Sequence, residues 1–117
     1  MSIERLAGGA RGRSRATIHD GRVYTVATAP DTNQNLAGQT AQTLAALDRN
    51  LADAGTDKSR ILAATVYIVD IGEKDEMDAV WCEWIGPAEN WPQRACLCTG
   101  LAGDTLVEIT LVAALPD

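Results

Sequence analysis

Two charged residues, Arg94 and Glu108, lie in stretches of the chain where a charge is unexpected. Each belongs to an otherwise apolar segment typical of an interior β-strand, and charged side chains are rarely buried there without a partner. A guanidinium matches a carboxylate as a rigid fork, whereas a glutamate can accept a proton or orient water. The pair predicts one of two arrangements. Either Arg94 and Glu108 form a structural ion pair or carry edge-strand charges, or Arg94 binds a substrate carboxylate while Glu108 acts on water.

The other reactive side chains are few and do not complete a catalytic set. His19 is the only histidine and stands beside a predicted turn, which excludes a Ser-His-Asp triad. Cys96 and Cys98 are two residues apart on one face of a predicted strand, but they lack the further cysteine or histidine that a zinc site needs. We therefore expect packed thiols and no zinc site.

The first half of the chain predicts a hairpin followed by a long helix. Asp20-Gly21 suits the positive φ angles of a tight turn between strands over 15–19 and 22–26. Asp31 and Gln34 have the spacing of a capping box, and Gly55 is a typical helix stop, so a helix is predicted over 33–54.

The second half predicts three strands and one more helix. A nearly continuous apolar run over 61–69 indicates a central strand buried on both faces. The helix is expected over 73–85, and the last strands over 94–98 and 106–113. The order β-β-α-β-α-β-β predicts an α+β fold, a two-layer sandwich of a mixed β-sheet with both helices on one face.

Composition limits the class of protein. The 117 residues suit a single domain over 1–117, with residues 1–12 as an arm that is either poorly ordered or a short strand. Phenylalanine is absent and alanine occurs 19 times, so the core is thin, and the uncovered sheet face is expected to pack on other copies. The net charge of −6 argues against nucleic acid, and no apolar run is long enough to cross a membrane. The N-terminus lacks the apolar segment of a secretory signal, so we expect a cytoplasmic protein with reduced thiols.

Several segments together resemble one known family. They are Gly-Arg-Val-Tyr-Thr at 21–25, Ala-Thr-Val-Tyr-Ile-Val-Asp at 64–70, Pro-Gln-Arg-Ala-Cys at 92–96 and Val-Glu-Ile at 107–109. This pattern resembles the RidA/YjgF family of reactive intermediate deaminases, also described as endoribonuclease L-PSP-like. The stretch over 78–84 is similar to a short, divergent branch of that family.

The resemblance implies a chorismate-mutase-like fold in a homotrimer, with a ligand site in each cleft between subunits. It implies hydrolysis of small 2-imino or 2-enamino acids to 2-keto acids and ammonia, without metal or cofactor. Arg94 would bind the substrate carboxylate, while Glu108 and the backbone at Cys96 would hold the attacking water.

Three family positions differ in this sequence. Arg13 stands where the family has tyrosine, Val26-Ala27 replace serine-glycine, and Asp78 replaces asparagine. By position these four residues are expected at the substrate, and Arg13 suggests a substrate with additional negative charge. The alternative is a trimer of the same fold that binds a small anionic carboxylate without turnover. Ribonuclease activity is disfavoured by the acidic charge and the lack of a catalytic histidine.

Overall fold

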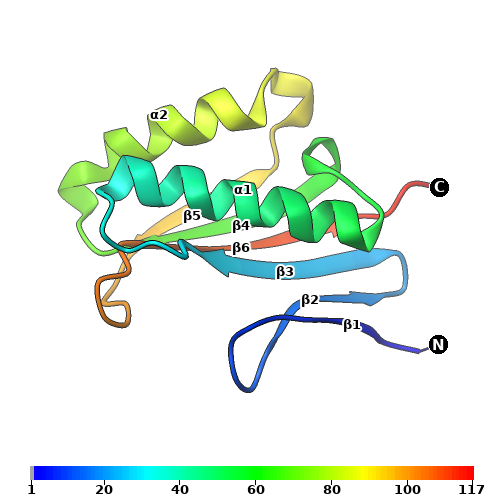
Figure 1. Ribbon diagram of the computed structural model, residues 1–117. Coiled ribbons are helices and arrows are strands. Elements are labelled where there is room, and N and C mark those ends of the chain that lie inside the picture. The colour runs from blue at the N-terminus through cyan, green and yellow to red at the C-terminus, as the bar shows by residue number, and fades with distance from the viewer. Residues whose placement is uncertain (1) are drawn as a thin grey trace.

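Both helices pack on the same face of one mixed sheet (Figure 1). The computed structural model describes residues 2–117. Its strands are β1 (Glu4–Ala7), β2 (Ser14–His19), β3 (Arg22–Thr28), β4 (Ile61–Ile68), β5 (Gln93–Cys98) and β6 (Val107–Ala114), and its α-helices are α1 (Leu36–Ala54) and α2 (Lys74–Ile85). Three short 3₁₀ helices, η1 (Lys58–Arg60), η2 (Ile71–Glu73) and η3 (Ala88–Asn90), lie between them. The expected α+β sandwich is confirmed, with β1 as a sixth strand in the N-terminal arm.

The sheet has the strand order β1-β2-β3-β6-β4-β5, and only β4 and β5 run parallel. The C-terminal strand β6 therefore lies between the hairpin and β4. The molecule measures 42 × 36 × 19 Å, and its small third dimension is what one helix layer on one sheet produces. None of the helices within residues 2–117 is long and apolar enough to cross a membrane.

The hairpin and the helix end follow from residues that tolerate positive φ. Asp20 and Gly21 have φ angles of 53° and 75°, which joins β2 to β3 in the tight turn that was predicted. Gly55, at φ 94°, ends α1, and its N–H and that of Thr56 bond back to carbonyls of the last turn.

The predicted start of α1 was wrong. Asn35, rather than Asp31, caps the helix, since its Oδ1 accepts from the Gly38 N–H at 2.9 Å and α1 begins at Leu36. Asp31 instead closes a turn by accepting from the N–H of Asn33. The two candidate caps, Asp31 and Asn35, stand four residues apart. The helix begins after Asn35, and its first residue, Leu36, is buried in the core.

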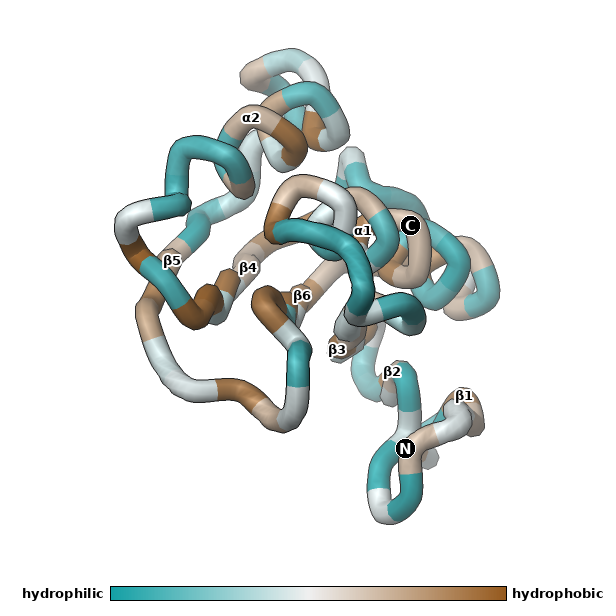
Figure 2. The backbone as a smooth tube through the Cα atoms, turned by 60° about the vertical axis from the view of Figure 1, so that its left-hand side comes forward, coloured by the Kyte–Doolittle hydropathy of each residue, from teal (hydrophilic) through white to brown (hydrophobic). Residues whose placement is uncertain are grey.

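The core lies between the helices and one face of the sheet. Alternate residues of β6 are buried toward the helices, namely Val107, Ile109, Leu111 and Ala113, and β4 and β6 are mostly hydrophobic along their length in Figure 2. The expectation that the strand over 61–69 is buried on both faces does not hold within one chain, because its residues alternate between buried and partly exposed. Tyr24 and Leu97, each 46% exposed, lie on the open face.

Candidate functional site

The sequence-predicted site residues fall into two groups within one chain. The α2–β5 group consists of Arg94, Asp78 and Cys96. The β3-edge group consists of Arg13, Val26 and Ala27, and it lies at the end of β3 that β2 leaves unpaired. Glu108 joins the second group through an ion pair with Arg13.

Arg94 is held from two sides beneath α2. Its Nη2 lies 2.7 Å from Oδ1 of Asp78, and its guanidinium carbon lies 5.3 Å from the ring centroid of Trp81. Nη1 points toward the Met77 sulfur at 3.9 Å. Within residues 2–117 the guanidinium has no other hydrogen-bond acceptor, so further N–H groups are available to a ligand.

Lys74 adds a second cation that sequence reasoning missed. Its Nζ lies 2.6 Å from Oδ2 of Asp78, one helical turn away, so a single carboxylate bridges Lys74 and Arg94. Two cations around one anion leave a net charge of +1, which attracts an anionic ligand. The spacing of Lys74 and Asp78 in a predicted helix was the signal that could have identified this ion pair.

The surroundings change the acidity of two groups in this cluster. Burial raises the pKa of the Asp78 carboxyl, but the hydrogen bonds from Lys74 and Arg94 outweigh it, so the pKa lies below its ordinary value. Burial raises the pKa of the Cys96 thiol, and the nearby Arg94 and Lys74 only partly oppose this effect. Cys96 is therefore a neutral thiol at neutral pH, and its side chain is not a thiolate nucleophile.

Asp78→Asn is expected to reduce stability at pH 7 but not in acid. A depressed carboxyl pKa stabilises the fold above the unfolded-state value of about 4, and this contribution is lost as the pH falls through the folded pKa. Because the side chain is one-quarter exposed, the loss at pH 7 should be only about 0.5–1 kcal/mol. Urea unfolding at pH 7 and pH 3 measures it. An equal difference between variant and wild type at both pH values would contradict this assignment.

The predicted alternative of an ion pair between Arg94 and Glu108 was wrong. Arg94 is paired with Ala64 of β4 and Glu108 with Tyr67 of the same strand, an odd number of residues apart. Side chains alternate along a strand, so the two residues lie on opposite faces of the sheet. Arg94 faces the helices, and Glu108 faces the open side.

Glu108 has a loose partner in the N-terminal arm. Nη1 of Arg13 lies 3.6 Å from Oε2 of Glu108, and the two side chains are 46% and 28% exposed. This distance exceeds the 2.7–2.9 Å or so of a direct charge-assisted hydrogen bond, so both groups are available to a ligand or to water.

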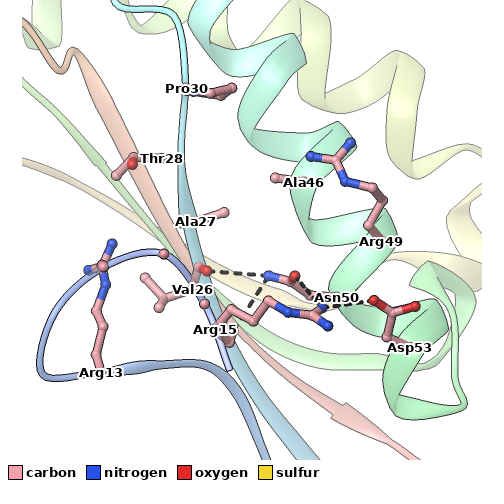
Figure 3. A pocket seen from close by; sticks show the side chains of 13 residues that line it. Arg13, Arg15, Val26, Ala27, Thr28, Pro30, Ala46, Arg49, Asn50 and Asp53 are labelled. Carbon is pink, nitrogen blue, oxygen red and sulfur yellow. Dashed lines mark hydrogen bonds and ion pairs between the residues drawn. The ribbon is translucent and has the colours of Figure 1, made fainter. Parts of the chain in front are cut away.

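Arg13, Val26 and Ala27 line a cavity of about 520 Å³ between the β1–β2 loop, β3 and α1 (Figure 3). The cavity exists because β2 pairs with β3 only as far as Thr25, which leaves residues 26–28 without a strand partner on that side. The other lining residues are Gly8, Gly9, Ala10, Arg15, Thr28, Pro30, Ala46, Arg49, Asn50 and Asp53. Its volume is typical of a small-molecule site.

A buried polar network supports this cavity, and sequence reasoning missed it. Asn50 is 6% exposed, donates to Oγ1 of Thr25 at 3.0 Å and accepts from Nη1 of Arg15 at 3.0 Å. Arg15 also pairs with Asp53 at 2.9 Å (Figure 3). It donates to the Ala7 carbonyl as well, which ties the N-terminal arm to α1. In the sequence, the available signal was an asparagine at a position of the apolar repeat, three residues after Leu47 and next to Leu51.

Each group can bind an anion, but neither is a complete catalytic site. The α2–β5 group offers a cation and a neutral thiol, and the β3-edge group offers a carboxylate, cations and a cavity. The predicted reaction needs the carboxylate-binding Arg94 and the proton acceptor Glu108 beside one another. One chain holds these two residues on opposite faces of its sheet.

Matches to known proteins extend along nearly the whole chain. The family model described as endoribonuclease L-PSP matches residues 10–115. A RutC family protein of Haemophilus ducreyi is 39% identical over 104 residues, which span 87% of this chain and 88% of the relative. The RutC family protein YoaB of Escherichia coli is 34% identical over 98% of this chain and 100% of its own length.

Solved structures show the same fold. NMB1025 of Neisseria meningitidis, described as a member of the YjgF protein family, superimposes with a TM-score of 0.91 at 33% identity. The alignment covers 100% of this chain and 98% of that one. A structure from Pseudomonas aeruginosa, 28% identical, superimposes with a TM-score of 0.89 over 98% of this chain and 100% of its own.

Proposed function

The chain belongs to the YjgF/RidA family, and from this premise we propose that it is a deaminase acting as a homotrimer. It hydrolyses small 2-imino and 2-enamino acids to 2-keto acids and ammonia, at ligand sites in the clefts between subunits. No metal or organic cofactor takes part, and the reaction takes place in the cytoplasm, where the three free thiols of the chain stay reduced.

The placement of Arg94 and Glu108 on opposite faces of the sheet carries this proposal. A cleft between two copies can bring the Arg94 of one protomer to the Glu108 of its partner, whereas one chain cannot. The open sheet face supports such an assembly, since it exposes Tyr24 and Leu97 and has no cover within residues 2–117.

The reaction needs a fixed anion and an oriented water. Arg94 binds the carboxylate of the imino acid, and Trp81 and Asp78 hold its guanidinium in place. Glu108 and the backbone at Cys96 orient a water whose oxygen attacks C2. The carbon–oxygen bond forms, Glu108 passes protons from the water to the nitrogen, the carbon–nitrogen bond breaks, and 2-keto acid and ammonia leave.

The residues that differ from the family pattern have distinct places in this scheme. Asp78 orients Arg94 and does not contact the substrate carboxylate, because two carboxylates repel each other. Val26 and Ala27 form an apolar wall of the cleft, and Arg13 lies beside Glu108 within reach of an anionic group.

The test measures ammonia release and assembly in one preparation. An amino-acid oxidase generates imino acids in situ, and the protein should speed ammonia release beyond the spontaneous rate. Light scattering should give a trimer of about 37 kDa, three chains of 12.4 kDa. A stable monomer would overturn the proposal. Thermal stabilisation by 2-oxobutyrate without faster ammonia release would favour the non-catalytic carboxylate-binding trimer.

A further inference from the structure

The cavity at the β3 edge is positively charged in an acidic protein. Three arginines, Arg13, Arg15 and Arg49, line it together with a single carboxylate, Asp53, while the whole chain carries a formal charge of −6. We infer that this cavity binds a second anionic group of the substrate, so that the substrate is a dicarboxylic 2-imino acid. This inference rests on the proposed function, in which Arg94 of the neighbouring protomer binds the first carboxylate in the cleft between subunits.

The three arginines differ in how far their charges are compensated. The charge of Arg15 is compensated, since Nη1 pairs with Asp53 and bonds to Asn50, and Nε donates to the Ala7 carbonyl. Arg49, by contrast, has no carboxylate within 4.0 Å among residues 2–117, and Arg13 has only the loose contact with Glu108. Arg13 and Arg49 are therefore the two cations available to a ligand.

These two cations reach the cavity from different elements. Arg13 rises from the β1–β2 loop, and Arg49 comes from α1 across the cavity (Figure 3). Two guanidinium groups around one space can bind a carboxylate as forked donors. Arg15, fixed between the arm and α1, holds the loop and the helix at this separation.

The lining of the cavity also indicates which kind of ligand bears the second carboxylate. Small apolar side chains form part of its wall, namely Val26, Ala27, Pro30 and Ala46. A wall of this kind accepts a short carbon chain between the two carboxylates. The volume of about 520 Å³ is larger than a carboxylate alone requires. The chemistry of the cavity therefore fits a short-chain dicarboxylate better than a simple inorganic anion.

Calorimetry with two five-carbon keto acids tests the inference. 2-Oxoglutarate and 2-oxopentanoate share the 2-keto acid group and differ in the second carboxylate. The wild-type protein should bind 2-oxoglutarate at least about tenfold more tightly. Arg49→Gln and Arg13→Gln should each bring this ratio close to one and change the affinity for 2-oxopentanoate by less than about threefold.

Arg11→Gln is the matched control, because it removes the same charge from the same loop but Arg11 does not line the cavity. It should retain the preference. Equal affinities in the wild type, or an equal loss of preference in Arg11→Gln, would overturn the inference. Ammonia release is measured separately on the imino acids of glutamate and norvaline. A retained binding preference without ammonia release would refute the proposed deaminase and leave the anion assignment standing.

Discussion

Arg94→Ala is expected to lower kcat/KM for imino acid hydrolysis by about 10³-fold while the chain stays folded. In the proposed reaction, the substitution removes the forked cation that binds the substrate carboxylate. The fold should tolerate it, because Asp78 keeps its ion pair with Lys74 and no carboxylate is left without a partner. Steady-state ammonia release measures the effect, and light scattering with thermal unfolding checks the assembly and the fold.

Two control variants separate charge from geometry in this experiment. Arg94→Lys retains the charge but loses the fork and its stacking on Trp81, so it should recover only part of the activity. Arg22→Ala removes an exposed arginine whose closest acid, Asp20, is 4.0 Å away, and it should leave the rate unchanged. An Arg94→Ala protein with the wild-type rate would show that Arg94 does not bind the substrate.

Glu108→Gln is expected to lower kcat by about 10³-fold and to leave KM nearly unchanged. The amide keeps the size of the side chain but cannot accept a proton from water, which is the role proposed for Glu108. It also loses the ion pair with Arg13, which is loose and exposed enough to contribute little to stability. Steady-state kinetics over a range of imino acid concentrations separates kcat from KM.

Glu108→Asp and Glu89→Gln serve as comparisons for this variant. Glu108→Asp retains a carboxylate at a greater distance from the water and should keep part of kcat. Glu89→Gln makes the same chemical change at an exposed glutamate in η3 and should have no effect. If Glu108→Gln raises KM and leaves kcat intact, Glu108 binds the substrate and does not activate water.

The sequence determined the elements whose signals are local. Asp20-Gly21 specified the hairpin turn, because few other residue pairs adopt two positive φ angles. Gly55 specified the end of α1 for the same reason, and the repeat of apolar residues placed both helices. The unusual positions of Arg94 and Glu108 could be recognised from the chain alone, since a charge in an apolar strand is visible without coordinates.

Only the tertiary structure decided how the site residues are grouped. Arg94 forms its ion pair with Asp78 and not with Glu108, because the strand register places Arg94 and Glu108 on opposite faces of the sheet. This register depends on pairing between segments that are far apart in the chain. The network of Asn50, Arg15 and Asp53 likewise joins α1 to the N-terminal arm. Local patterns specify each segment because its neighbours in the chain set its conformation, whereas side-chain partners depend on long-range packing that no single segment encodes.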